Sequence, residues 1–376
     1  MEYRKLGKTG ITNSIIGLGT MRLPVVDGEE KNIDKKEAIE LIRHAIDNGI
    51  NYIDTAYPYH GGTSEALVGE ALKDGYREKV TLATKMPSWL ITDYSDFDKY
   101  LDEQLRNLQT DVIDVYLLHT LNRAFWENLK KHRVFDFIEE AKIKGKIKNI
   151  GFSFHDEKSV FDDIIRAYDW DLCMIQLNYM DENHQATLDG LKLAGELEIP
   201  AIIMEPLKGG LLVNPPESIQ RIWDESLVKR DPIHWSFKWI ANRPEVVTIL
   251  SGMGSKEQID RNITYVNDLE VNSLTDQEEY LYKRVKHAYD DRIKVSCTDC
   301  KYCMPCPEGV NIPGNFKLIN DVFIYENVDS SRRIYNNFYK NEARASSCIS
   351  CRVCETKCPQ SIEISEELKK VHEILG

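Results

Sequence analysis

Eight of the nine cysteines lie in the last 80 residues, where they form two runs of four. The runs are Cys297-x2-Cys300-x2-Cys303-x2-Cys306-Pro307 and Cys348-x2-Cys351-x2-Cys354-x3-Cys358-Pro359. Thiolates spaced in this way wrap a short loop, so that their sulfurs converge on one metal centre. The chain begins without the apolar segment of a secretion signal, and a disulfide framework is therefore not expected. The spacing predicts a metal-binding tail.

Tandem runs that end in Cys-Pro favour two [4Fe–4S] clusters. Zinc is the weaker alternative, because it needs two separate Cys-x2-Cys pairs, and free thiols are the other. The runs are similar to those of bacterial ferredoxins, in which the fourth thiolate of each run, fixed by the following proline, binds the other cluster. Cluster one then takes Cys297, Cys300, Cys303 and Cys358, and cluster two takes Cys348, Cys351, Cys354 and Cys306. The first run is one residue short before Cys306, which leaves this cross-ligation open.

An acid, phenols, an amine and an imidazole follow three successive apolar segments of the chain. They are Asp54 with Tyr57 and Tyr59, then Lys85, then His119. Each alone is commonly a cap, a solvated charge or a buried structural side chain. If the segments are parallel strands, their carboxyl ends meet at one face, which is where barrel enzymes carry their active sites. The joint occurrence therefore favours a catalytic site.

Short apolar segments alternate with amphipathic ones from about residue 14 to 265. The predicted strands are 14–19, 51–54, 80–85, 112–119, 147–151, 172–176, 201–204 and 246–250. Continuous apolar runs are typical of parallel strands buried on both faces. Eight strand–helix units predict an α/β fold, a closed (β/α)8 TIM barrel. A doubly wound open sheet is the rival, but the first strand ends in Gly17-Leu18-Gly19 without the third glycine of a dinucleotide-binding turn.

Smaller features flank this alternation. A hairpin is expected before the barrel, around Lys8-Thr9-Gly10, and a helix over 276–285. The segment 205–231, with one Gly-Gly and one Pro-Pro pair, is expected to be a long loop of the kind that is functional or disordered. Cys173 lies in an apolar strand and is expected to be only a small buried side chain.

Composition limits the partners. The chain has 376 residues, enough for a barrel and an appendage, and its net charge is −13, from 48 basic and 61 acidic residues. Such a field repels phosphate backbones, so nucleic acid is not expected as a partner. No segment approaches the roughly 20 apolar residues of a membrane span. A soluble cytoplasmic protein is the expectation.

From Tyr3 to about Tyr265 the sequence resembles the aldo-keto reductase family, and within it the subgroup with a C-terminal iron–sulfur domain. The context of the phenols, Tyr59-His60-Gly61-Gly62-Thr63-Ser64-Glu65 with Gly69, fits that family. Its catalytic tetrad maps onto Asp54, Tyr59, Lys85 and His119. Tyr59 is preferred over Tyr57 because the family tyrosine lies five residues after its aspartate. We expect a barrel domain over 1–270, a helical connector over 271–296 and a ferredoxin-like domain with two clusters over 297–376.

The resemblance implies hydride transfer between NAD(P)H and a small-molecule carbonyl, or the reverse oxidation of an alcohol. A tyrosine with a pKa of about 10 is a weak acid at neutral pH. Lys85 is expected to lower the pKa of Tyr59, and Asp54 to keep Lys85 charged and oriented. His119 would donate a hydrogen bond to the carbonyl oxygen. Among nearby aromatic residues, Trp89 is the best candidate for the substrate pocket.

The cofactor contacts of the family carry over incompletely. Gln176, Asn178 and Ser153 match residues that hold the nicotinamide amide, with Phe154 in place of the usual asparagine, and Met204 stands where an aromatic is usual. Glycines before a helix can cradle phosphate, and the segment expected to do so comprises Gly252, Gly254, Ser255, Lys256, Gln258 and Asn262. Gln258 replaces the arginine that often binds the 2′-phosphate, for which Lys256 or Arg261 could substitute. NADP is therefore only slightly favoured over NAD.

The two halves of the chain handle electrons differently. Nicotinamides transfer a hydride, whereas iron–sulfur clusters take one electron at a time. A flavin could connect them, although no flavin motif is present. The clusters could equally be structural or serve a redox protein partner. The alternative to a carbonyl reductase is thus an electron-transfer protein in which the barrel serves as a docking or sensing scaffold.

Overall fold

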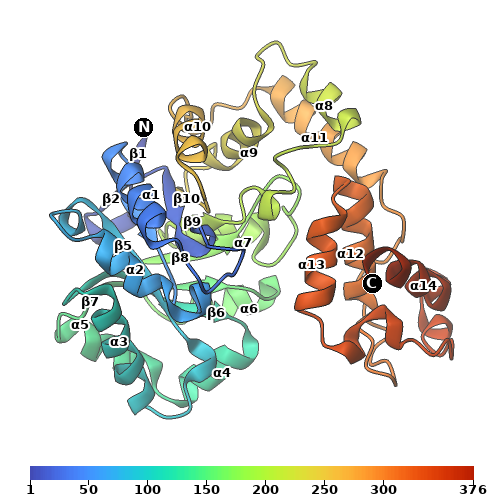
Figure 1. The fold of residues 1–376 in the computed structure, drawn as a ribbon, viewed down its shortest axis with the longest axis horizontal. Coiled ribbons are helices and arrows are strands. Elements are labelled where there is room, and N and C mark those ends of the chain that lie inside the picture. Colours follow the sequence, from blue (N-terminus) through green and yellow to red (C-terminus); the bar gives the residue numbers. More distant parts are fainter. The chain divides into compact units, whose positions relative to one another are not determined.

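The computed structural model describes all 376 residues, Met1 to Gly376. The chain forms two compact units: Met1–Gly209 with Ile233–Leu274, and Gly210–Pro232 with Thr275–Gly376 (Figure 1). Most of the predicted connector, residues 275–296, belongs to the second unit, as does 210–232, which the prediction placed with the barrel. None of the helices combines the length and the apolar composition that crossing a bilayer requires.

The first unit is a closed barrel of eight parallel strands in the order β10-β3-β4-β5-β6-β7-β8-β9, which confirms the predicted fold class (Figure 1). The strands are β3 (Ile16–Gly19), β4 (Tyr52–Asp54), β5 (Thr81–Met86), β6 (Ile113–Leu121), β7 (Ile147–Phe154), β8 (Leu172–Gln176), β9 (Ala201–Met204) and β10 (Val246–Ser251). All eight predicted strands are present. Strands β6 and β7 run further than predicted because their ladder continues to the pair Leu121–Phe154. This extension carries their polar ends further toward the carboxyl face.

Helices surround the strands. They are α1 (Lys35–Asp47), α2 (Ser64–Ala71), α3 (Ser95–Leu108), α4 (Arg123–Lys131), α5 (Val134–Ile143), α6 (Lys158–Ile165), α7 (Thr187–Glu196), α9 (Pro232–Ala241) and α10 (Lys256–Val266). The first is typical: Asp34 caps it by accepting from the Glu37 amide at 3.0 Å, and Leu41 and Ile42 lie on its buried face. The predicted hairpin is also present, as β1 (Tyr3–Lys5) and β2 (Thr12–Ser14).

The interior of the barrel is filled by apolar side chains from every second strand position. Val115, Leu117, Met174 and Ile202 belong to this core, with Leu6 from the hairpin loop. A filled interior leaves no room for a ligand inside the barrel. Polar side chains therefore gather at the two ends of the strands, and the catalytic candidates lie at the carboxyl ends.

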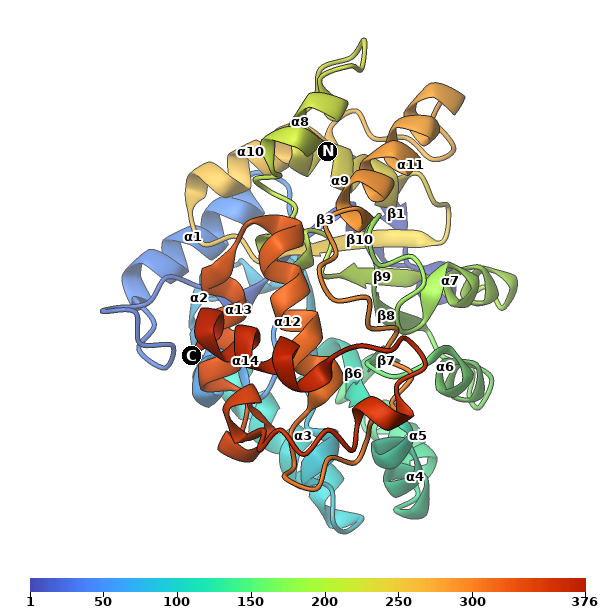
Figure 2. The ribbon, with the colours of Figure 1, turned by 90° about the vertical axis from the view of Figure 1, so that its right-hand side faces the viewer.

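The second unit contains helices only. They are α8 (Glu217–Trp223), α11 (Asp276–Asp290), α12 (Ile312–Tyr325), α13 (Val328–Asn337) and α14 (Ile364–Leu375). Figure 2 shows the last three packed together. The prediction of a long loop over 205–231 is wrong, because its middle forms α8. Trp223 packs edge-on against Tyr282 of α11, at 5.1 Å between ring centroids, and this buried contact orders the segment.

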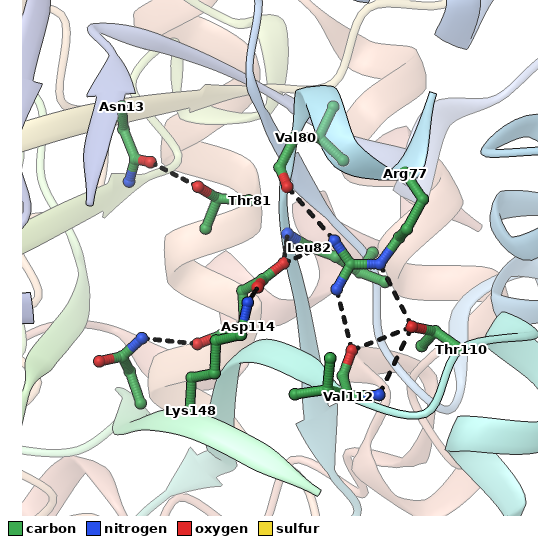
Figure 3. A network of polar contacts seen from close by, with 10 residues as sticks. Asn13, Arg77, Val80, Thr81, Leu82, Thr110, Val112, Asp114 and Lys148 are labelled. Atoms are coloured by element: carbon green, nitrogen blue, oxygen red, sulfur yellow. Dashed lines mark hydrogen bonds and ion pairs between the residues drawn. The ribbon is translucent and has the colours of Figure 1, made fainter. Parts of the chain in front are cut away.

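A buried carboxylate joins three strands at the end opposite the catalytic candidates (Figure 3). Asp114 of β6 accepts from the Leu82 amide at 2.9 Å and from Lys148 Nζ at 2.7 Å. Its other partner, Arg77, lies 2.8 Å away and also donates to the Val112 carbonyl at 2.9 Å. Because Asp114 is only 5% exposed, its charge depends on these donors.

We expect the substitution Asp114→Asn to lower the free energy of unfolding of the barrel by about 2–4 kcal/mol. The asparagine amide carries no charge, and its NH2 group would face the donors that the Asp114 carboxylate accepts from. Chemical denaturation followed by tryptophan fluorescence would measure the change. Asp189→Asn is a suitable control, because Asp189 is exposed and its ion pair with Lys192 is 3.4 Å long. Equal midpoints for both variants would contradict the assigned role of Asp114.

Candidate active site and cluster ligands

The four tetrad candidates come together at the carboxyl ends of β4, β5 and β6. Lys85 Nζ donates to Asp54 Oδ1 at 2.5 Å and to the Thr55 carbonyl at 2.9 Å. It also donates to Tyr59 Oη at 3.2 Å. The order Asp54, Lys85, Tyr59 is therefore a continuous hydrogen-bonded chain. Tyr57, the other phenol, instead donates to Glu103 at 3.3 Å.

Burial and the neighbouring charges have opposite effects on the pKa values of these hydrogen-bonded side chains. Asp54 and Lys85 are both only 2% exposed. Burial alone would lower the pKa of Lys85, but the Asp54 carboxylate and Tyr59 outweigh it and raise that pKa. Burial raises the pKa of Asp54, and Lys85 opposes this rise. Lys85 therefore stays an ammonium at neutral pH.

The Lys85 charge is only one of the influences on the pKa of Tyr59. Burial is the largest influence and raises the pKa of Tyr59, while the Lys85 ammonium lowers it less. The net direction is upward, contrary to the expected lowering. Tyr59 is therefore protonated at neutral pH, and the Lys85 ammonium makes loss of the phenol proton less unfavourable than burial alone would.

His119 completes the group of four. Its ring lies edge-on to that of Tyr59, at 6.2 Å between centroids, and 5.3 Å from that of Trp89. Burial lowers its pKa well below the usual value, and the Lys85 charge adds to this effect, so the ring is neutral. Its Nδ1 is buried without a partner. Trp89, the pocket candidate, is 37% exposed and lies beside the His119 ring.

The cysteines of the tail line two cavities. The first is lined by Cys297, Cys300, Cys303 and Cys358, and the second by Cys303, Cys306, Cys348, Cys351 and Cys354. Burial is the largest influence on the Cys297 thiol and raises its pKa, and the neighbouring groups that add to the rise include Asp299, Cys300 and Cys358. Burial likewise raises the pKa of Cys354, and the groups that add to it include Glu355, Cys348 and Cys306. Cys358 thus lies with the first run and Cys306 with the second, while Cys303 lines both cavities; the cross-ligation stays a prediction.

This arrangement fits [4Fe–4S] clusters better than a single ion. Each thiolate of a cubane binds a different iron, so the sulfurs have to surround a space. No three metal-binding side chains of the chain converge on one point. Ile312, Phe316 and Ile364 line the first cavity beside the cysteines and give it an apolar wall.

The family model of the aldo/keto reductases matches residues 15–279, and that of the 4Fe-4S dicluster domain matches residues 296–363. The chain belongs to the aldo/keto reductase family. It is an oxidoreductase of this type with a C-terminal dicluster domain, and the domain definition implies two clusters.

Relatives agree with this assignment. An NADH-specific methylglyoxal reductase of Escherichia coli is 28% identical over 77% of this chain and 100% of its own. An uncharacterised Bacillus subtilis oxidoreductase, YrpG, is 31% identical over 56% of this chain and 68% of its own. The holo form of aldo-keto reductase AKR11C1 from Bacillus halodurans superposes with a TM-score of 0.64, at 25% identity over 76% of this chain and 96% of its own.

Two of the predicted nicotinamide contacts of this aldo/keto reductase share one carboxylate. Gln176 and Asn178 donate to Asp181 Oδ2 at 3.0 and 2.9 Å. Burial would raise the pKa of Asp181, but the ion pair with Lys208, at 2.5 Å, and these donors lower it. Asp181 and Lys208 were missed from the sequence. The carboxylate fixes the amide nitrogens of both side chains. Gln176 Oε1 accepts from Gln185 Nε2 at 3.3 Å and is the acceptor left for a ligand.

The other two predicted contacts lie at the ends of β7 and β9, the strands on either side of β8. Ser153, at the end of β7, is buried, and its Oγ accepts from the Thr120 amide at 2.7 Å. Its hydroxyl hydrogen is therefore available in the direction of a ligand. Met204 ends β9, is half-buried and packs on the barrel core. Its flexible thioether presents a soft apolar surface at this strand end.

The predicted phosphate segment follows β10 and is largely satisfied by its own side chains. Ser255 caps α10 by accepting from the Gln258 amide at 3.3 Å, and Gln258 Oε1 accepts from the Gly254 amide at 2.8 Å. Lys256 is paired with Glu40 at 3.1 Å. The glycine amide is therefore already occupied.

A buried network that holds Lys85 was also missed from the sequence. Gln104 of α3 donates to the Lys85 carbonyl at 3.0 Å and to Glu65 Oε1 at 2.6 Å. Thr84 donates to the same carboxylate oxygen at 2.6 Å, and Tyr116 donates to Gln104 Oε1 at 2.7 Å. Glu65 belongs to the segment that carries the family resemblance, but its spacing alone gave no sign that it positions Lys85.

Serine substitutions test which cysteines share a cluster. We expect Cys300→Ser and Cys358→Ser to lose the same cluster, with about half of the iron and one shared residual EPR spectrum. Cys351→Ser and Cys306→Ser should give the complementary spectrum. Iron content and EPR after anaerobic purification would measure this. A Cys358→Ser spectrum that matches Cys351→Ser instead would overturn the cross-ligation.

Proposed function

We propose that this aldo/keto reductase reduces a small-molecule carbonyl by hydride transfer from NAD(P)H, or oxidises the corresponding alcohol. The observation that carries the proposal is the buried chain Asp54–Lys85–Tyr59 with His119 across from the phenol. A structural ion pair alone would not need a protonated phenol at its outer end. The four polar groups instead match the needs of a carbonyl oxygen that gains negative charge.

A bound NAD(P)H supplies the hydride. Tyr59 Oη donates its proton to the carbonyl oxygen as the alkoxide forms. Lys85, held charged by Asp54, stabilises the phenolate that remains. The ammonium and the phenolate stay joined by one hydrogen bond. The neutral His119 donates a second hydrogen bond to the same oxygen. Trp89, beside His119, excludes water from the reacting oxygen.

Gln176, Asn178 and Ser153 would hold the nicotinamide amide, with Met204 against the ring, and Asn262 would lie near the adenine half. Lys256 with Gly252, Gly254, Ser255 and Gln258 stands at the phosphate end.

We propose the cytoplasm as the compartment, because exposed clusters of low potential persist best in a reducing medium. The methylglyoxal reductase among the relatives suggests small aldehydes as the first substrates to screen.

A second function rests on the exposure of the tail. Cys300 and Cys351 are exposed, one in each thiol group. Clusters bound there would exchange single electrons and would be within reach of a redox protein partner. In that function the barrel has no turnover of its own, which separates it from the first proposal.

The substitution Tyr59→Phe tests the two functions against each other. We expect it to lower kcat/KM for aldehyde reduction by about 10²–10⁴-fold, because the proton donor is lost. Tyr57→Phe is the matched control, since Tyr57 points to Glu103, and it should stay near wild type. Steady-state rates with NADPH and NADH would be compared. Normal turnover by Tyr59→Phe would rule out the carbonyl-reductase mechanism, and clusters still reduced by a partner would favour the electron-transfer function.

The pH dependence follows from two displaced pKa values. The pKa of Tyr59 lies above its usual value, so the acid form is lost only as pH rises well into the alkaline range. That of His119 lies well below 6.5, so the neutral ring persists down to acidic pH. We therefore expect kcat/KM for reduction to be flat between about pH 6.5 and 9. An inflection near pH 6.5 that disappears in His119→Asn would show that the imidazole is charged instead.

A further inference from the structure

We propose that Arg22 is the cation that binds a phosphate group of the nicotinamide dinucleotide, an inference that rests on the proposed function. Arg22 ends the short helix η2 (Thr20–Arg22) that follows β3. The strand β3 pairs with β10, up to the register pair Leu18–Ser251. The segments that follow these two strands are therefore neighbours at the carboxyl face of the barrel.

The side chain of Arg22 lies across the turn between β10 and α10. Its aliphatic part packs so closely on Gly252 that a Cβ there would lie 2.8 Å from Arg22 Cγ. A Cβ on Gly254 would lie 3.0 Å from the Arg22 carbonyl oxygen. A side chain at either position would meet Arg22, so the two glycines allow its close approach to the turn. The guanidinium beyond this contact is exposed and forms no ion pair.

The backbone that carries Arg22 is fixed from the catalytic side. Thr20 is fully buried, and its Oγ1 donates to the Asp54 carbonyl at 3.0 Å. His60, directly after Tyr59, places its Nε2 3.1 Å from the Thr20 carbonyl oxygen. Leu23, on the other side, is only 3% exposed. A charge mounted on a rigid segment loses little entropy when it binds a ligand.

The electrostatics of this chain favour such a cation. A net charge of −13 repels a dinucleotide that carries two or more negative charges. Gln258 is neutral and already bonded to Gly254, and Lys256 is committed to Glu40 at 3.1 Å. Arg22 is the guanidinium that packs on the turn itself. A guanidinium can form two parallel hydrogen bonds with a phosphate.

An unsatisfied amide points to the same place. Asn262 of α10 is 4% exposed, and its Nδ2 donates to Ser251 Oγ at 3.2 Å, so the side chain faces the residue that precedes the turn. Its Oδ1 has no partner. A buried acceptor without a donor is costly unless a ligand or water supplies one. The exposed cation suits a phosphate, and the buried acceptor suits a hydrogen-bond donor of the same dinucleotide, an amine or a hydroxyl.

Binding of NADP⁺ and NAD⁺ to the full, cluster-loaded chain tests the inference by anaerobic isothermal titration calorimetry. Arg22→Met keeps the packing on Gly252 and removes only the charge, and we expect it to weaken binding about tenfold or more. Arg22→Lys should fall between it and the wild type. Arg166→Met is the matched control, because Arg166 is exposed and unpaired elsewhere on the barrel unit. Arg261→Met tests the rival cation on α10.

The two nucleotides identify the phosphate. Weaker binding of NADP⁺ alone by Arg22→Met assigns Arg22 to the 2′-phosphate, and equal weakening of both nucleotides assigns it to the diphosphate; either result supports the inference. Affinities within twofold of wild type for both nucleotides would overturn it, most clearly if Arg261→Met loses binding instead. A wild-type chain that binds neither nucleotide would refute the proposed function itself, and the inference with it.

Discussion

The ammonium of Lys85 is the charge around which the rest of the barrel site is arranged. A buried lysine loses several kcal/mol of hydration, and one carboxylate at hydrogen-bond distance is needed to keep it protonated. Asp54 provides this from the adjacent strand, in the fixed register that pairs Asp54 with Ala83. The Thr55 carbonyl and Tyr59 take the two remaining donor directions. Because every proton of the ammonium is used, the phenol can occupy only one place, and the geometry of the catalytic group follows from this constraint.

The sequence predicted those parts of the site that depend on strand ends and on spacing. Asp54, Lys85 and His119 were found because buried parallel strands are apolar throughout, so a charge marks where each one ends. Tyr59 was separated from Tyr57 by the five-residue spacing of the family. Their roles in catalysis stay a prediction. The barrel itself was predicted because eight apolar segments alternate with helical ones over a suitable length.

Partners that meet only in three dimensions could not be predicted. The Asp181–Lys208 pair spans 27 residues and the Glu65–Gln104 pair spans 39, and no local pattern connects them. The net pKa of Tyr59 was misjudged for the same reason. The attraction of Lys85 can be inferred from neighbouring strand ends, but the opposing effect of burial depends on how tightly the surrounding side chains close over the phenol. The segment 205–231 was taken for a loop because its glycines and prolines hide a seven-residue helix whose stability comes from Trp223 against Tyr282.

The barrel site is suited to proton transfer, and the tail to electron transfer. Asp54, Lys85, Tyr59 and His119 bind and move protons, and none of these side chains accepts a single electron at the potentials of metabolism. Eight thiolates in two groups can hold two clusters, which together accept two electrons, the number that one hydride carries. Two clusters can therefore take up the electrons of one hydride. None of the four tetrad side chains, however, can divide a hydride into single electrons. If electrons pass from nicotinamide to cluster in this protein, a third redox group such as a flavin, or the substrate as a radical, has to divide them. If they do not pass, the tail stabilises the fold or serves an external partner, and the carbonyl reduction that we propose for the barrel needs no cluster.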